Sequence, residues 1–388
     1  MARSSRRGHH EGCVYYEPER ERWVAEITID TGQRKKYRAK TKQEAIRKKN
    51  EVLRELEQGV LATGPQRKLG AYLEDWLENV HKSTLKVSAY VKYQKNIKYI
   101  LMDRIGNIWL QKLMPEQVQR FYVRLSDKGL SSKTVNAVHG VLHLALDNAV
   151  RWGYVARNVC DVVSPPRIVT KEAVFLTVEQ AHTLLDAVRE HRLEVLFLLM
   201  MVTGMRRGEV LALRWSDIDF DRYCLHVLHT VDYIPKYGYV EDTPKSKAGK
   251  RKINLPFFLI EILEEQKREI DILKTKAGEE WTEMDLVFPS LKGGYFNPSY
   301  LWKVFKKIIQ RAGLADMRLH DLRHSTVTIL LAKGVHIKVI SELLGHSDIV
   351  ITLRTYGHLL PSMQSDVVAA WEEEFRKPGK EDLFIPHK

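Results

Sequence analysis

The chain has 388 residues, with 62 Lys+Arg against 49 Asp+Glu and a formal net charge of +13. That length exceeds one ordinary domain, and 44% hydrophobic with 29% charged residues excludes a wholly disordered chain. The longest apolar run, residues 195–203, is far shorter than the roughly 20 residues of a membrane span. We therefore expect a cytoplasmic protein without a membrane partner, and the positive charge favours nucleic acid as the partner.

Residues 1–64 predict a small domain of three strands and one helix. The runs at residues 13–16 and 22–29 favour strands, the second because apolar and polar residues alternate in it, and a basic third strand follows a turn. Thr41 and Glu44 have the spacing of a capping box at the start of a helix. The expected buried face of this helix consists of Ile46, Leu53, Leu56 and Val60.

The basic third strand is the candidate DNA contact of this domain. A small sheet so rich in cations is suited to docking on the phosphate backbone of DNA. A merely solvated charged face is the alternative interpretation. The residues expected to contact DNA are Arg34, Lys35, Lys36, Arg38 and Lys40.

Residues 65–168 predict a helical domain of four helices. The second is expected to run from about residue 83 to residue 101, the third to begin at Pro115, and the fourth to begin after Ser131. Such a bundle either clamps DNA or serves as a spacer. The paired prolines in residues 163–167 predict an extended linker. The expected buried stripe of the fourth helix is Val135, Val138, Leu142, Ala145 and Ala149.

Residues 169–388 predict a larger, mainly α domain with a small β-sheet insert. A capping box at residues 177–180 begins a helix, and residues 193–201 are apolar on all sides, as in a buried helix. Strands are expected at residues 225–228 and 251–255, on either side of a lysine-rich loop. The three regions together predict a multidomain chain of mixed α and β class.

Four short motifs in this last region could carry phosphodiester chemistry. Guanidinium groups bind two phosphate oxygens at once, histidines move protons near neutral pH, and a tyrosine hydroxyl can act as a nucleophile. Each motif alone is weak, because a surface arginine, a helix-cap histidine or a core tyrosine would produce the same pattern. Their order along the chain is far more specific. The motifs are TGMRRGE with Arg206, HDLRH with His320 and Arg323, LLGHS with His346, and TYGH with Tyr356.

These motifs, together with TPKSKAGKR, resemble those of the tyrosine recombinase (phage integrase) family over roughly residues 170–375. The resemblance implies a site-specific recombinase that cleaves and rejoins DNA through a 3′-phosphotyrosine intermediate, to integrate or excise a mobile element. It implies Tyr356 as the nucleophile, no cofactor, an arm-type DNA-binding domain at residues 1–64 and a core-binding domain at residues 65–168. The implied partners are duplex DNA with attachment sites, three further copies in a homotetramer, and an excisionase or a host DNA-bending protein.

The resemblance also implies roles for the other site residues. Lys245 best matches the general acid that protonates the leaving 5′-oxygen, and Lys247 is the second choice. Glu209 is expected to brace the site. His324 and His358 are expected to be peripheral. The residues expected to bind the phosphate or move a proton are Arg206, Arg323, His320 and His346.

No metal is expected at this site. His9, His10 and Cys13 could begin a zinc site, but no second ligand pair completes a set of four.

Two rival functions remain open: a type IB topoisomerase, which rejoins the same strand, and a non-catalytic DNA-binding regulator, which has no need of Tyr356. A short amphipathic helix is expected at residues 369–375, docked on a neighbouring protomer or on its own domain.

Overall fold

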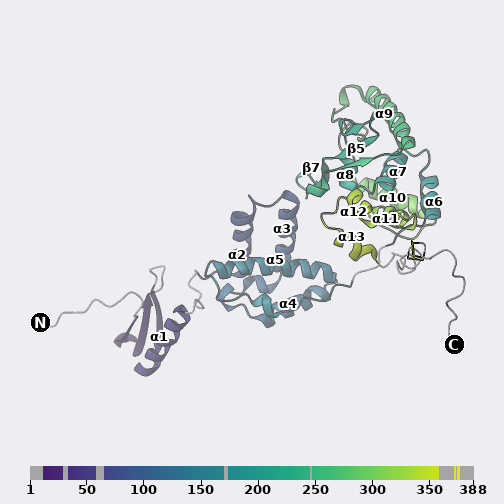
Figure 1. Cartoon of the computed structure of the whole chain (residues 1–388). Helices are drawn as coiled ribbons and strands as arrows, with labels where there is room; N and C mark the ends of the chain where they lie inside the picture. The colour runs from purple at the N-terminus through teal and green to yellow at the C-terminus, as the bar shows by residue number, and fades with distance from the viewer. Residues whose placement is uncertain are drawn as a thin grey trace, which may run out of the picture. The chain divides into compact units, whose positions relative to one another are not determined.

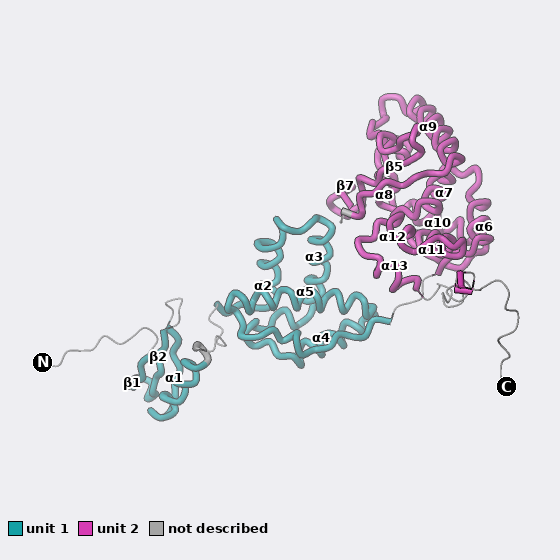
Figure 2. The backbone as a smooth tube through the Cα atoms, in the orientation of Figure 1, with its two compact units in different colours: residues 1–170 teal, residues 171–388 magenta. Residues whose placement is uncertain are grey.

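The computed structural model describes residues 12–28, 34–57, 65–169, 174–244, 247–357, 371–372 and 374–375 (Figure 1). The chain divides into two compact units, residues 1–170 and 171–388 (Figure 2). Helices dominate both units, and small antiparallel sheets occupy the start of the first unit and part of the second. The expected mixed α and β class is therefore confirmed.

The first unit begins with a three-stranded antiparallel sheet on which one helix packs. The helix starts as predicted, because the Thr41 hydroxyl accepts a hydrogen bond from the Glu44 N–H at 3.2 Å and the Glu44 carboxylate accepts one from the Thr41 N–H at 3.4 Å. The elements are β1 (Cys13–Glu17), the 3₁₀ turn η1 (Pro18–Arg20), β2 (Arg22–Thr28), β3 (Arg34–Ala39) and α1 (Lys42–Glu57).

The buried face of α1 differs from the prediction. Ile46 is exposed, whereas Ala45 and Val52 are buried. Ala45 and Val52 are two helical turns apart, so both face the sheet, and the small Ala45 side chain allows the helix to approach it closely. The other expected residues are Leu53, which is partly buried, and Leu56 and Val60, whose side chains lie outside the described part of the chain.

A helical bundle with its own core follows in the first unit. Pro115 opens the third helix, and the Ser131 hydroxyl caps the fourth by accepting a hydrogen bond from the Thr134 N–H at 3.3 Å, both as predicted. The second helix begins at Val87, later than expected. All members of the stripe predicted for the fourth helix are buried. The elements are α2 (Leu69–Trp76), the π-helical turn η2 (Leu77–His81), α3 (Val87–Leu101), η3 (Arg104–Asn107), η4 (Leu110–Lys112), α4 (Pro115–Asp127), α5 (Ser132–Arg151) and η5 (Val159–Val162).

The second unit packs around α7 (Glu194–Thr203), whose apolar side chains are mostly buried, as predicted. The helix α11 (Asp321–Ala332) packs against α7, and the Thr326 hydroxyl donates a hydrogen bond of 2.7 Å to the Met201 carbonyl oxygen. This contact brings the first turn of α11 close to the end of α7. The other helices are α6 (Val178–Val188), α8 (Arg207–Leu211), η6 (Trp215–Asp217), η7 (Lys247–Gly249), α9 (Phe257–Ala277), η8 (Gly278–Glu280), α10 (Pro298–Arg311), α12 (Ile337–Leu344) and α13 (Ile349–Tyr356).

Two small sheets complete the second unit. The two predicted strands pair antiparallel as β5 (Cys224–Val227) and β8 (Arg251–Asn254), and β4 (Ile218–Asp219) adds a short third strand. A hairpin of β6 (Thr230–Ile234) and β7 (Gly238–Asp242) was not predicted. Its alternating polar and apolar residues fit half-buried strands, so the pattern could have indicated it.

The C-terminal helix stays a prediction. Residues 371–372 and 374–375 are helical, but the rest of residues 369–375 lies outside the described part of the chain. Within the residues that the structure describes, no helix has the length and apolar character needed to cross a membrane.

Candidate active site

Arg206 lies at the junction between α7 and α8. Gly204 ends α7 in the left-handed region with a φ of 61°, and Arg206 is the residue that caps α8. The buried Glu209 carboxylate accepts hydrogen bonds from the Arg206 backbone N–H at 2.9 Å and from Arg206 Nη1 at 2.7 Å. Glu209 therefore fixes both the backbone and the side chain of Arg206, as expected of a bracing residue.

Arg251 is a second partner of Glu209 and was not predicted from the sequence as a site residue. Arg251 Nη2 donates to Glu209 Oε2 at 2.9 Å, and its Nε donates to the Leu343 carbonyl oxygen at 2.7 Å. Burial raises the pKa of Glu209, but the hydrogen bond from Arg251 and the charges of Arg251 and Arg206 outweigh burial and hold the pKa below its usual value. Arg251 lies within the quoted TPKSKAGKR motif, which is the signal that could have identified it.

Arg323 is a buried arginine that binds two helix ends at once. Its Nη1 donates to the Gly204 carbonyl oxygen at 2.7 Å, and its Nη2 donates to the Leu344 carbonyl oxygen at 2.6 Å. Burial and the charges of Arg206 and Arg251 lower its pKa to about 9, at which the guanidinium is still charged at neutral pH. A guanidinium has five N–H donors, so donors remain for a phosphate.

His346 follows Gly345, which ends α12 with a φ of 68°. Its Nε2 lies 3.1 Å from Arg323 Nη2, and its Nδ1 lies 2.8 Å from the Thr352 hydroxyl. Because arginine can only donate, Nε2 is the acceptor and the proton of the neutral ring lies on Nδ1. Burial, followed by the charges of Arg323, Arg206 and Arg251, lowers the pKa of His346 to about 4. Thr352 has no local sequence signal, because only the turn between α12 and α13 brings it to His346.

His320 immediately precedes α11 and lines a cleft with Arg206. Burial lowers the pKa of His320 to about 4, and the electrostatic effects of His324, Arg323 and Arg206 act in the same direction. The cleft has a volume of about 610 Å³ and is also lined by Arg318, Trp302, Pro244 and Gly249. It therefore has the size of a ligand site, and its charged lining residues are Arg206, Arg207 and Arg318 against Glu209 and Asp232.

The loop with the candidate general acids begins and ends at this cleft. Pro244 and Gly249, which flank the loop, both line the cleft. Lys245 and the side chain of Lys247 lie outside the described part of the chain, so the structure does not choose between them.

Tyr356, near the end of α13, is 4% exposed, and its hydroxyl forms a hydrogen bond with Nδ1 of His324. Burial raises the pKa of Tyr356 to about 12, although the charge of Arg323 opposes this. The expectation that His324 is peripheral is wrong, since its ring lies between those of His320 and Tyr356, with centroid distances of 5.3 and 5.6 Å. His358 lies outside the described residues.

The basic residues of the first unit divide between the two faces of its sheet. Lys42 and Lys49 of α1 lie close to Trp23 and Ile27, so α1 covers the face to which these side chains point. In the strand register, Ile27 pairs with Lys35, whereas Glu26 pairs with Lys36. Because successive strand residues alternate between faces, Lys35 lies on the helix side. The open face carries Arg34, Lys36 and Arg38, with Glu17 and Glu26 as ion-pair partners, and the exposed Lys40 follows β3.

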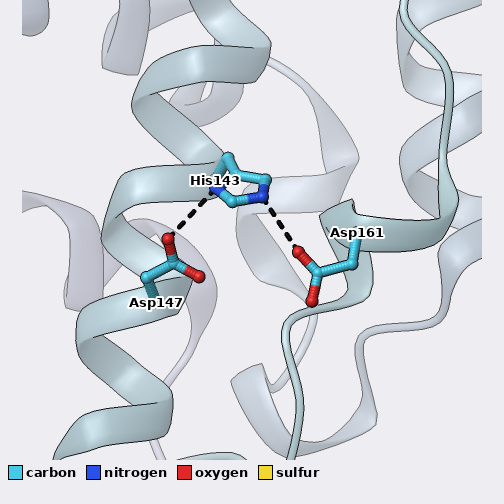
Figure 3. A group of neighbouring side chains, drawn as sticks. All are labelled: His143, Asp147 and Asp161. Atoms are coloured by element: carbon cyan, nitrogen blue, oxygen red, sulfur yellow. Dashed lines mark hydrogen bonds and ion pairs between the residues drawn. The ribbon is translucent and has the colours of Figure 1, made fainter.

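Figure 3 shows a group of three candidate metal ligands among the described residues, His143, Asp147 and Asp161. Nδ1 of His143 lies 3.2 Å from the Asp147 carboxylate, and Nε2 lies 2.9 Å from that of Asp161. Asp147 also accepts a hydrogen bond from the Asn158 amide at 2.7 Å. These contacts account for the cluster as a link between α5 and η5. His9 and His10 lie outside the described residues.

Comparisons with known proteins decide the family. The family model described as the phage integrase family matches residues 174–363, and that of the phage integrase N-terminal SAM-like domain matches residues 68–126. The tyrosine recombinase XerC-like protein of Caldanaerobacter subterraneus subsp. tengcongensis is 33% identical over 360 residues, which cover 88% of this chain and 92% of that relative. The chain belongs to the phage integrase family of tyrosine recombinases.

This recombinase has further relatives of similar length. The ICEBs1 integrase of Bacillus subtilis is 27% identical over 345 residues, covering 87% of the recombinase and 92% of the relative. Solved structures share its fold. The Tn1549 transposon integrase in complex with transposon right end DNA superposes with a TM-score of 0.67 at 20% identity, over 80% of the recombinase and 100% of that chain. A lambda integrase tetramer bound to a Holliday junction gives a TM-score of 0.54 at 17% identity. This similarity covers 89% of the recombinase and 94% of the lambda integrase chain.

Proposed function

We propose that the recombinase cleaves one strand of duplex DNA by attack of the Tyr356 hydroxyl oxygen on a phosphodiester. A bond forms between this oxygen and phosphorus, the bond from phosphorus to the 5′-oxygen breaks, and the 5′-oxygen leaves as a hydroxyl. Because the 3′-phosphotyrosine keeps a phosphodiester bond, a 5′-hydroxyl from a second duplex can reverse the step and rejoin the DNA without ATP. Exchange between two sites then integrates or excises a mobile element.

The observation that carries this proposal is the joint position of Arg206, Arg323, His320 and His346. Arg206 and Arg323 place positive charge where a pentacoordinate phosphate gains negative charge. His320 and His346 are neutral at pH 7, since both pKa values lie near 4. Neutral imidazoles can hydrogen bond to the phosphate oxygens without adding to the repulsion between the arginines.

Lys245 is proposed as the general acid for the leaving oxygen, with Lys247 as the alternative. Support comes from Pro244 and Gly249, which place the ends of the loop at the cleft that Arg206 and His320 line. In an in-line displacement the leaving oxygen lies on the far side of the phosphorus from Tyr356, and a lysine ammonium is a suitable proton donor for it.

The proposed substrate is duplex DNA carrying attachment sites, bound by a homotetramer. The solved relatives support this, since one is bound to transposon end DNA and another is a tetramer on a Holliday junction. Two duplexes with two cleavage positions each require four nucleophiles. Residues 1–64, 65–168 and 169–388 are proposed as the arm-binding, core-binding and catalytic domains, with an excisionase or a host DNA-bending protein as accessory partners.

The test is covalent trapping on a nicked duplex that carries an attachment site made from the element's own flanking DNA. Cleavage next to the nick releases a short strand, so rejoining is prevented and the adduct accumulates. We expect a protein–DNA adduct that maps to Tyr356 and is lost in Tyr356→Phe. The exposed hairpin tyrosine Tyr233 provides a matched control, because Tyr233→Phe should form the adduct normally. An adduct of full yield in Tyr356→Phe contradicts the proposal.

A further inference from the structure

His324 has a contact with the nucleophile that the proposed function does not use. It lies in the first turn of α11, one helical turn after His320, and its Nδ1 is hydrogen bonded with the Tyr356 hydroxyl. Tyr356 itself is buried, so this ring nitrogen occupies the position that water would take around an exposed phenol. A buried tyrosine needs such a partner, but a carbonyl oxygen would satisfy it equally well.

The protonation state of the pair follows from its surroundings. The charged and titratable groups that face His324 are His320, Asp321, Arg318, Arg323 and Tyr356. The carboxylate of Asp321 is hydrogen bonded with Arg318 at 2.7 Å, so it is already paired. Burial lowers the pKa of His324, with Arg318 and Arg323 acting in the same direction. His324 is therefore a neutral imidazole at pH 7, and in the tautomer that carries its proton on Nε2 the Nδ1 atom accepts the hydrogen bond of the Tyr356 hydroxyl.

The other two histidines are placed differently. His346 has its Nε2 next to Arg323 and its Nδ1 next to Thr352, which leaves no ring nitrogen for Tyr356. His320 lines the cleft beside Arg206. Among the described histidines of the second unit, His324 is the one with a hydrogen bond to the nucleophilic oxygen.

We propose that His324 is the general base of strand cleavage and that its Nδ1 takes the proton of the Tyr356 hydroxyl. This inference rests on the proposed function, which makes Tyr356 the nucleophile. As the oxygen of Tyr356 bonds to phosphorus, its proton moves to Nδ1 and gives an imidazolium, while the 5′-oxygen leaves with a proton from the loop lysine. In the rejoining step the imidazolium returns its proton to the departing tyrosine oxygen, so the enzyme ends as it began.

The test uses single-turnover cleavage of the nicked attachment-site duplex with a bridging sulfur in place of the scissile 5′-oxygen. A thiolate leaves without protonation, so the rate reports on the nucleophile side alone and is independent of Lys245. His324→Asn keeps a hydrogen-bonding group near the Nδ1 position but cannot take the proton. We expect cleavage by His324→Asn to fall about 10²–10⁴-fold at pH 7. Its rate should then rise about tenfold per pH unit up to pH 9, because hydroxide must remove the proton, whereas the wild-type rate should be nearly flat above pH 7.

A second variant and two controls make the outcome decisive. His324→Ala should be rescued by added imidazole, which refills the space and can accept a proton. His182→Asn, at an exposed position of α6, should behave as wild type. A His324→Asn enzyme that cleaves as fast as wild type, or slowly with the wild-type pH profile, overturns the proposal and leaves a structural role. If Tyr356→Phe still forms the adduct, the proposed function fails instead, which is a separate result.

Discussion

Arg323 Nη1 donates a 2.7 Å hydrogen bond to the carbonyl oxygen of Gly204, a residue 119 positions earlier in the chain. Nη2 of the same guanidinium donates to the Leu344 carbonyl oxygen. A Cβ atom at Gly204 would lie 2.8 Å from Leu344 Cδ2, so the ends of α7 and α12 approach each other closely here. Arg206 follows Gly204 by two residues, and His346 follows Leu344 by two residues. One buried cation thus fixes the spacing of two site residues as well as its own position.

Replacing Arg323 by Lys should therefore impair catalysis although the charge is kept. A single ammonium cannot bond both carbonyl oxygens and still contact a phosphate with planar geometry. We expect strand cleavage by Arg323→Lys to fall about 10²–10³-fold, the scale seen for a lost oxyanion donor, with nearly unchanged DNA binding. Single-turnover cleavage and a gel-shift titration measure the two effects. Arg311→Lys, at an exposed position of α10, is the matched control, and normal cleavage by Arg323→Lys would remove Arg323 from the site.

The sequence predicted local features well and tertiary contacts less well. The capping boxes at Thr41 and Thr177 depend on residues three positions apart, and both form. By contrast, the large Ile46 was expected in the core, but the fold buries the small Ala45, because packing distance rather than hydrophobicity decides between them. His324 was expected to be peripheral. Its contact with Tyr356 arises only because α13 packs near α11, and the sequence around His324 does not indicate this.

Glu209→Gln should destabilise the second unit. The Glu209 carboxylate and the Arg251 guanidinium are 3% and 6% exposed, so the substitution leaves a buried arginine without its counter-charge. Removing one partner of a buried ion pair costs about 3–5 kcal/mol. Urea unfolding at pH 7 measures this loss, and Asp186→Asn, which breaks an exposed pair with Arg189, should change the midpoint little.

The same carboxylate should make stability depend on pH. Its pKa is lower in the folded state than in the unfolded state, where it is about 4.3. Its contribution is therefore fully present above that unfolded value and is lost as the pH falls through the lower folded pKa. The difference in unfolding free energy between wild type and Glu209→Gln should be constant from pH 6 to 8 and shrink below pH 4. A difference that stays constant below pH 4 would contradict this.

The sulfur-bridged substrate also identifies the general acid. A variant without the acid leaves an alkoxide that must depart unprotonated, but a thiolate needs no proton, so cleavage of the sulfur substrate should be restored selectively. We expect this rescue for Lys245→Ala and none for Lys252→Ala, a lysine in β8 that serves as control. Rescue of Lys247→Ala in place of Lys245→Ala would transfer the role to Lys247, and rescue of neither would place the acid elsewhere.

The two faces of the N-terminal sheet should contribute unequally to DNA binding. Arg34, Lys36 and Arg38 lie on the open face, where the ion pairs with Glu17 and Glu26 are exposed and easily exchanged for phosphate contacts. Lys35 lies on the side that α1 covers.

Charge reversal on the open face should therefore weaken binding to accessory sites and flatten its salt dependence. Each neutralised phosphate contributes about −0.9 to the slope of log K against log salt, so Lys36→Glu with Arg38→Glu should reduce the slope by about two such contributions. Lys35→Glu, a single reversal on the other face with half the charge change of the double variant, is the control and should leave the slope nearly unchanged. Titrations of the full-length chain against accessory-site duplexes at several salt concentrations measure both. Equal effects per reversed residue would mean that net charge, rather than this face of the sheet, attracts DNA. No effect of either would leave the N-terminal sheet without a DNA-binding role.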